Sequence, residues 1–149
     1  MEENAYQILT KILERYESYE RFLKYPGDWG ERAFRGWLVF ELFHKYLGWS
    51  IEYIVFGERF DVLLINKDKK PIINIETKKP GNGLIGYEDF KKRLEDYQTL
   101  YYAILTDGFL WLNLDCLDKT EKKRDISDGE KAFENFIKPF WSRKYIVGE

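Results

Sequence analysis

The stretch from residue 60 to residue 79, FDVLLINKDKKPIINIETKK, constrains the fold more than any other part of the chain. It contains two short apolar runs rich in Val, Leu and Ile, which are typical of buried strands. The four polar residues 67–70 between the runs have a length that is common in hairpin turns. We therefore predict an antiparallel hairpin whose ends carry Asp61 and the triplet Glu76-Thr77-Lys78.

The register of this hairpin decides which charged side chains meet. If Asn66 pairs with Pro71, the cross-strand pairs are Ile65–Ile72, Leu63–Asn74 and Asp61–Glu76. Directly opposed residues of an antiparallel pair point to the same face of the sheet. Lys78 shares the face of Glu76 because side chains alternate along a strand. We expect the opposite face of the second strand to be buried in the core, with Ile73, Ile75 and Thr77.

Two carboxylates on one partly apolar face repel each other by several kcal/mol at a separation of ~4 Å. A divalent cation removes this repulsion. A site of hard oxygen ligands with few protein contacts favours Mg²⁺, for which we expect Mn²⁺ to substitute. Such a cation activates water and offsets charge on a phosphate, and Lys78 can orient the water or stabilise the transition state. Asp61, Glu76 and Lys78 therefore predict phosphodiester hydrolysis. In the structural alternative, Asp61 ends a strand and the other two form an exposed ion pair.

The order Asp61, a 14-residue spacer and Glu76-Thr77-Lys78 resembles the PD-(D/E)XK nuclease superfamily. Two further phrases, Leu47-Gly48-Trp49 and Leu105-Thr106-Asp107-Gly108, are similar to the amino-terminal nuclease domain of type I restriction enzymes and its stand-alone relatives. The resemblance covers about residues 28 to 114. It implies a Mg²⁺-dependent DNA endonuclease with a restriction-endonuclease-like core.

A helix before the hairpin often supplies a further metal-binding acid in this superfamily. The apolar periodicity predicts such a helix over residues 29–46, nearly apolar all round and therefore buried. The resemblance places Glu31 at the position of the acid, so we expect Glu31 to bind the metal with Asp61 and Glu76. Two alternatives stay open: Glu31 forms a capping box with Asp28, and Glu41, paired with Lys45, is the helical acid.

The net charge of −2 does not indicate a nucleic-acid-binding protein. A nuclease needs only a local basic surface, however. Relatives often have Gln and, four residues later, Tyr on the helix after the hairpin. Arg93 with Tyr97 or Gln98 with Tyr102 can match this pair, and the distance to the Leu-Thr-Asp-Gly phrase favours Arg93 and Tyr97. The residues that we expect near DNA are Lys79, Lys91, Lys92, Arg93 and Tyr97. The alternatives are a solvated basic face and a core position for Tyr97.

We predict one α/β domain over residues 1–149. A helical extension (1–27) that packs on the core precedes the core (28–114), and a tail with a short helix (115–149) follows it. The core should hold a mixed central sheet of about five strands, an antiparallel meander plus a parallel crossover strand, flanked by helices. Further strands are predicted at residues 51–56, 101–106 and 109–114, with Asp107-Gly108 as a two-residue turn. Charged residues 115–128 are predicted to form a mobile loop.

The single cysteine and the charged amino terminus favour a reducing, cytoplasmic setting. The chain has no apolar run near the ~18 residues of a membrane span. DNA is the expected partner, with a homodimer or a partner subunit as further possibilities. Two other functions stay open: a catalytically silent DNA-binding or accessory module on the same fold, and a Holliday-junction-resolving nuclease. The sequence leaves open the DNA specificity, the choice of DNA over RNA, and endonuclease or exonuclease action.

Overall fold

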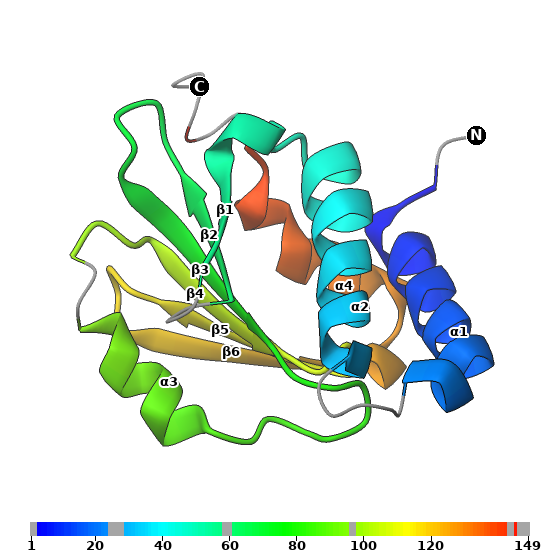
Figure 1. Ribbon diagram of the computed structural model, residues 1–149. Coiled ribbons are helices and arrows are strands. Elements are labelled where there is room, and N and C mark those ends of the chain that lie inside the picture. The colour runs from blue at the N-terminus through cyan, green and yellow to red at the C-terminus, as the bar shows by residue number, and fades with distance from the viewer. Residues whose placement is uncertain (1–2, 24–28, 58–60, 96–97, 143–144, 146–149) are drawn as a thin grey trace.

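A six-stranded mixed sheet forms the middle of the protein, with helices on both faces (Figure 1). The computed structural model describes residues 3–23, 29–57, 61–95, 98–142 and 145. The strands are β1 (Ile54–Phe56), β2 (Val62–Ile65), β3 (Pro71–Thr77), β4 (Tyr102–Thr106), β5 (Leu110–Asp115) and β6 (Thr120–Asp125). They lie in chain order; β3 and β4 pair in parallel and the other described neighbours are antiparallel. The predicted α/β class and mixed sheet are confirmed, with six strands rather than five.

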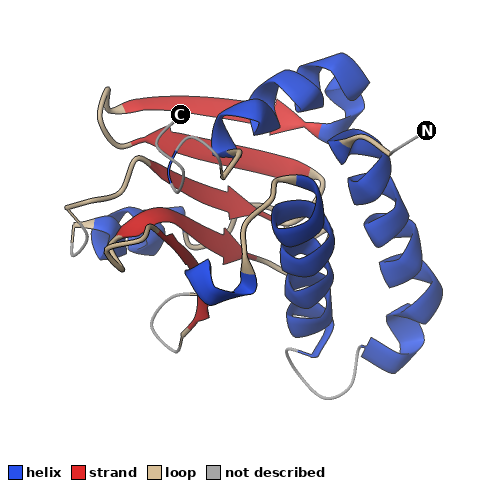
Figure 2. Ribbon diagram, turned by 90° about the horizontal axis from the view of Figure 1, so that it is seen from above, coloured by secondary structure: helices blue, strands red, loops and turns tan. Residues whose placement is uncertain are grey.

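The helices form two unequal layers. They are α1 (Ala5–Leu23), α2 (Trp29–Trp37), the π-helix η1 (Leu38–Tyr46), α3 (Tyr87–Leu94) and α4 (Glu130–Ile137), with short 3₁₀ turns at Ile51–Tyr53, Ile126–Asp128 and Lys138–Phe140. In Figures 1 and 2, α1, α2 and α4 cover one face of the sheet, and α3 lies on the other. None of the described helices is long and apolar enough to cross a membrane.

Strand alternation divides the core between these layers. The larger cluster lies under α1, α2 and α4 and includes Ile73, Ile75 and Ile104, each fully buried. The smaller cluster lies under α3 and is formed by Phe90, Ala103, Leu105 and Leu112. Thr77 is also buried, so the predicted core face of the second hairpin strand is confirmed.

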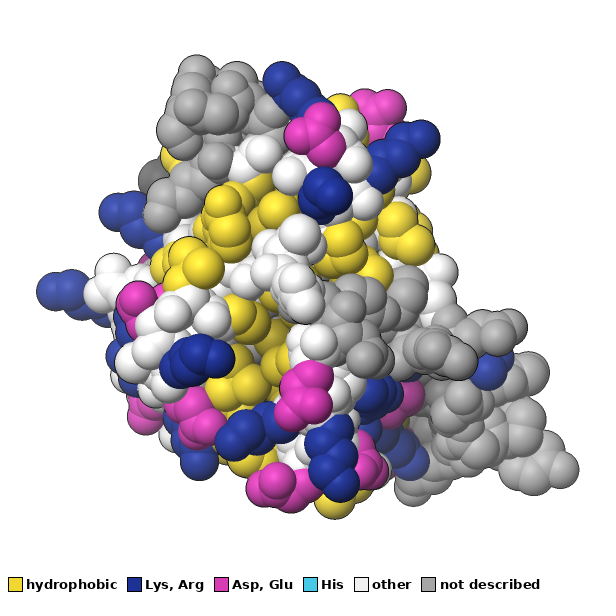
Figure 3. Space-filling model, turned by 90° about the vertical axis from the view of Figure 1, so that its left-hand side faces the viewer, with side chains coloured by type: hydrophobic (Ala, Val, Ile, Leu, Met, Phe, Trp, Pro, Cys, Tyr) yellow, Lys and Arg dark blue, Asp and Glu magenta, His cyan; other side chains and the backbone are white. Residues whose placement is uncertain are grey.

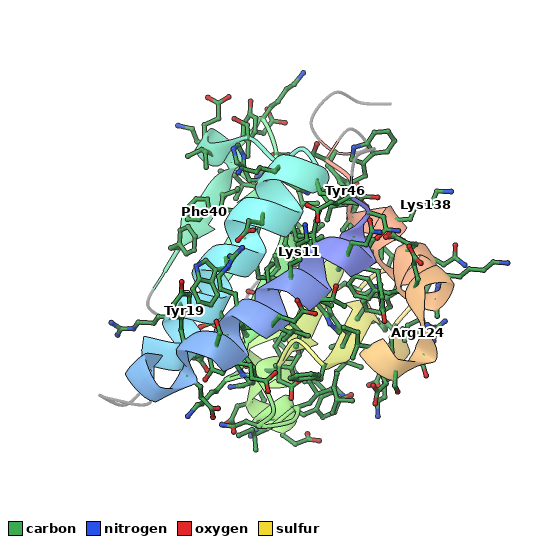
Figure 4. The ribbon with its side chains drawn as sticks, turned by 90° about the vertical axis from the view of Figure 1, so that its right-hand side faces the viewer. Lys11, Tyr19, Phe40, Tyr46, Arg124 and Lys138 are labelled. Carbon is green, nitrogen blue, oxygen red and sulfur yellow. The ribbon has the colours of Figure 1, made fainter. Side chains whose placement is uncertain are left out.

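The two amino-terminal helices pack on each other and on the sheet. Leu9 and Ile12 of α1 are fully buried in the larger cluster, which confirms that this helix packs on the core. The second predicted helix continues past Trp37 as a π-helix. Its expected burial all round is wrong at Phe40, which is 44% exposed and lies on the outer surface in Figure 4. The Phe40 ring instead packs against Phe56 at the sheet edge, with centroids 6.1 Å apart.

The hairpin turn is one residue tighter than predicted. Leu63 pairs with Asn74 as expected, but the register shifts after Leu64, so that Ile65 pairs with Pro71 instead of Ile72. The cause is Asn66, whose backbone N–H donates to the carbonyl of Lys70 at 3.0 Å. Its side-chain oxygen also accepts from the backbone N–H groups of Asp68 and Lys70. These bonds close the turn before the second strand begins.

Two predicted segments change type. Residues 51–53 form a 3₁₀ turn, so the first strand is only β1. Residues 120–125, expected within a mobile loop, form β6, which pairs antiparallel with β5 along its length. β6 lies at the edge of the described sheet and its side chains are mostly exposed. Charged side chains are common on edge strands because they discourage further pairing.

Candidate metal centre at the end of the hairpin

Asp61 stands directly before β2, beside the end of β3. The described ladder ends at Val62–Ile75, one step short of the predicted Asp61–Glu76 pair. Asp61 reaches across by its side chain instead: its Oδ2 accepts a hydrogen bond from the backbone N–H of Thr77 at 2.7 Å. The carboxylate is therefore fixed to the residue between Glu76 and Lys78.

Arg35 of α2 holds Asp61 from the other side. Its Nη2 lies 3.2 Å from Asp61 Oδ1 and donates to Glu31 Oε2 at 2.8 Å. Its Nε donates to the hydroxyl of Thr77 at 3.0 Å. The sequence reasoning missed Arg35. The available signal was its position four residues after Glu31, one helical turn along the same face.

Glu76 lies on the opposite face of β3 and is 4% exposed. Its Oε1 forms an ion pair with Arg93 of α3, and its Oε2 lies 3.3 Å from Lys78 Nζ. Burial raises the pKa of Glu76; the nearby charges of Lys78 and Arg93 lower it and that of Asp61 raises it, with a net upward shift. The charge of Asp61 thus acts on Glu76, although the carboxylate of Asp61 is held by Arg35 of α2 and that of Glu76 by Arg93 of α3.

A backbone hydrogen bond sets the position of Lys78, and its side chain lies close to a glycine. Its N–H donates to the carbonyl of Thr106 at 2.8 Å, which extends the β3–β4 pairing by one residue. A Cβ added to Gly86 would lie 3.4 Å from Lys78 Nζ, and Gly86 has φ +79°. The loop that carries Gly86 runs along the bottom of the molecule in Figure 1, from β3 to α3.

Asp107 fastens this loop to the sheet. Its buried carboxylate accepts from the N–H of Gly83 at 2.7 Å and from the N–H groups of Phe109 and Leu110. The N–H of Asp107 also donates to the carbonyl of Leu110, at 3.3 Å. The two turn residues are therefore Gly108 and Phe109, one position later than predicted. The Leu-Thr-Asp-Gly phrase positions the loop beside the acids.

The two candidate helical acids lie in different surroundings. Glu31 joins the network of Asp61 through Arg35. Glu41 forms a paired ionic contact with Arg15 of α1, with Arg15 Nη2 3.0 Å from Oε1. The predicted partner of Glu41, Lys45, is replaced by this residue from a neighbouring helix.

The candidate DNA-contacting residues differ in their surroundings. Lys91 Nζ lies 3.9 Å from Glu121 and 5.1 Å from the centre of the Tyr87 ring. Lys92 is exposed and Lys79 is half-buried. Tyr97 lies outside the described residues. Figure 3, which shows the left-hand side of the molecule in Figure 1, has basic and acidic side chains interspersed around an apolar area.

The oxygen atoms at the hairpin end fit a magnesium ion that keeps most of its water. Among the described residues, no three carboxylate, imidazole or thiol groups gather at metal-binding distance. Asp61 and Glu76 supply two carboxylates, and Mg²⁺ is commonly bound by one or two carboxylates with several waters. The buried Oε2 of Glu76 accepts no hydrogen bond of good geometry from the described residues, although Lys78 Nζ lies 3.3 Å away as an ion-pair partner. It is thus an oxygen with capacity for a cation.

Comparisons with known proteins bear on the fold. No family model and no curated protein sequence matches the chain. A cryo-EM structure of a DrdV–DNA complex is similar, with a TM-score of 0.63 and 16% sequence identity over 91% of this chain. The chain spans 14% of the DrdV chain. At this level of identity the likeness shows the fold, which is shared with one part of a larger protein bound to DNA.

Proposed function

We propose that the protein is a Mg²⁺-dependent DNA endonuclease of the PD-(D/E)XK type, with Mn²⁺ as a substitute metal. One observation carries this proposal: the carboxylate of Asp61 accepts a hydrogen bond from the backbone of Thr77, between Glu76 and Lys78 at the end of β3, and Lys78 Nζ lies 3.3 Å from Glu76. The fold shared with part of a DNA-bound protein supports DNA as the substrate. Glu76 is buried, so the centre is partly shielded from water and electrostatic interactions within it are strong.

Each residue has a defined task in this proposal. Asp61 and Glu76 would hold the ion, which would supply an activated water and offset charge on the phosphate. Lys78, next to Glu76, orients the attacking water or donates to the phosphate oxygens. Arg35 fixes the direction of Asp61 through its contacts with Asp61 and Thr77. Glu31 is linked to Asp61 through Arg35 and supplements the site as a further acid.

Arg93 can pair either with Glu76 or with a DNA phosphate. It forms an ion pair with Glu76, although its own side chain is 44% exposed. An arriving cation competes for the same carboxylate. The guanidinium released from Glu76 is suited to bind a DNA phosphate, because its planar donors match phosphate oxygens. Binding of the metal would therefore increase the affinity for DNA, and binding of DNA would increase the affinity for the metal.

The same contacts favour a second candidate, a catalytically silent DNA-binding or accessory module. Both acids already have basic partners on the protein itself: Arg35 for Asp61, and Lys78 with Arg93 for Glu76. A centre neutralised in this way is electrostatically complete without metal. This candidate predicts DNA binding that weakens with salt, with no cleavage products.

Cleavage of supercoiled plasmid separates the two candidates. The endonuclease proposal expects nicked or linear products with Mg²⁺ or Mn²⁺, none with chelator, and loss of activity in Asp61→Ala and Glu76→Ala. Asp68→Ala is the matched control, since Asp68 is an exposed acid at the other end of the same hairpin. Metal-dependent cleavage that survives both site substitutions would contradict the endonuclease proposal. DNA binding without products would favour the silent module.

A further inference from the structure

Asn74 is a buried polar residue on the face of β3 that carries Glu76. It is 5% exposed, and its cross-strand neighbours are Leu63 and Ala103. Ala103 belongs to the small apolar cluster under α3. Residues two apart in a strand point to the same side. The side chains of Asn74 and Glu76 are therefore neighbours on the face of β3 that lies beneath α3.

Both side chains hold a buried oxygen that accepts no hydrogen bond from the described residues. These atoms are Oδ1 of Asn74 and Oε2 of Glu76. Buried acceptors in folded proteins are nearly always satisfied by protein or ordered water, so each exception needs a physical reason. Glu76 Oε2 has Lys78 Nζ as an ion-pair partner at 3.3 Å, whereas Asn74 Oδ1 has no donor among the described residues. Asn74 is therefore the exception that needs a donor, and it lies beside the carboxylate of Glu76.

The spacing fits a hydrated ion better than a direct bond to both atoms. Residues two apart in a strand are separated by about 6.6 Å along its axis. A magnesium ion held by Glu76 keeps several waters, and each water carries two protons that need acceptors. On a floor bordered by Leu63 and Ala103, the side-chain oxygen of Asn74 is such an acceptor.

We propose that Asn74 completes the metal centre by accepting a hydrogen bond from a water in the hydration shell of the ion held by Glu76. This inference rests on the proposed function, because it takes the ion at Glu76 as given. Asn74 is then a positioning residue that would orient the hydration shell from one side of Glu76. Lys78 lies on the other side of Glu76 along the strand. Outer-shell partners of this kind typically change metal affinity 10- to 100-fold.

Asn113 is the matched control that the chain itself offers. It has the same 5% exposure as Asn74, and its Oδ1 also accepts no hydrogen bond from the described residues. Its cross-strand neighbours are Ile104 and Lys122, so its side chain lies on the opposite face of the sheet. A general effect of replacing a buried amide should therefore appear equally at both positions.

The test is calorimetric titration of the full chain with Mn²⁺, without DNA. Asn74→Leu should bind Mn²⁺ about 10- to 100-fold more weakly than the unsubstituted protein, and Asn113→Leu should bind it equally well. Asn74→Asp, which adds a carboxylate, should bind more tightly and serves as the deciding variant if Asn74→Leu does not fold. Unchanged affinity in Asn74→Leu, an equal loss in Asn113→Leu, or no gain in Asn74→Asp would overturn the inference.

The unsubstituted protein distinguishes this failure from a failure of the proposed function. If it binds no Mn²⁺, or if Asp61→Ala and Glu76→Ala bind as tightly as it does, the metal centre itself is refuted and the role of Asn74 falls with it. If those controls behave as expected while Asn74→Leu is unchanged, the metal centre stands and only the role of Asn74 is refuted.

Discussion

Arg35 Nη2 lies 3.2 Å from Asp61 Oδ1, so that a helix residue holds the first acid of the hairpin in place. The same guanidinium contacts Glu31 and Thr77. Three side chains from α2 and the hairpin are thereby joined through the guanidinium of Arg35. The side chains of Arg35 and Asp61 are 17% and 22% exposed, so this network is largely shielded from water.

Replacing Arg35 should lower stability because it leaves Asp61 and Glu31 without their shared cation. We expect Arg35→Ala to lower the free energy of unfolding by about 1–3 kcal/mol, the usual cost of leaving partly buried polar partners unsatisfied. Arg35→Lys keeps the charge but cannot make all three contacts, so it should give an intermediate loss. Urea denaturation measures both. Lys45→Ala, at an exposed position on the continuing helix η1, should change stability by less than about 0.5 kcal/mol; an equal loss there would contradict this role of Arg35.

Two glycines with similar backbones separate strain from contact with Lys78. Gly86 and Gly81 have φ +79° and +88°, so alanine at either is strained by about 1–2 kcal/mol. A Cβ on Gly86 lies 3.4 Å from Lys78 Nζ, whereas a Cβ on Gly81 has no described heavy atom within 4 Å. Both substitutions should lower stability similarly, but only Gly86→Ala should also reduce the rate of plasmid cleavage. Equal cleavage rates in the two folded variants would show that Gly86 does not position Lys78.

Arg93 should oppose metal binding and favour DNA binding. It pairs with Glu76, whose side chain is 5% exposed. We expect Arg93→Ala to bind Mn²⁺ more tightly, since a competing cation is removed, and to bind duplex DNA more weakly with a smaller dependence on salt. Lys92→Ala, at the exposed neighbouring position, should weaken DNA binding alone. Calorimetry and fluorescence anisotropy measure the two affinities; weaker Mn²⁺ binding by Arg93→Ala would contradict the proposed exchange.

The parts of the fold that follow local patterns could be predicted from the sequence. The hairpin, the pairing of Leu63 with Asn74 and the parallel strand β4 all follow from runs of apolar residues and the lengths between them. β6 could not be predicted, because its residues TEKKRD gain little apolar burial and are held by pairing with β5. The bulge after Leu64 depends on the side chain of Asn66, which an apolar pattern does not reveal.

The candidate site, like the fold, has a part that local patterns predict and a part that they do not. The prediction that Asp61 and Glu76 lie near each other follows from strand register, which is a local property. The contacts of Arg35 with Asp61 and of Arg93 with Glu76 join separate elements across different faces of the sheet. No periodicity in the sequence encodes such contacts. The same holds for the buried amide of Asn74, whose importance depends on what lies around it.

The role of Lys78 in catalysis is tested by the rate of supercoiled plasmid cleavage in Mg²⁺, measured for the unsubstituted protein and for Lys78→Met. Lys78 lies 3.3 Å from Glu76, whereas Lys67, at the exposed tip of the same hairpin, serves as the control in Lys67→Met. The proposed mechanism predicts metal-dependent cleavage that falls at least 100-fold in Lys78→Met, within the usual range for a lost proton-transfer or charge-stabilising group. It predicts little change in Lys67→Met. Equal rates for Lys78→Met and the unsubstituted protein would contradict it.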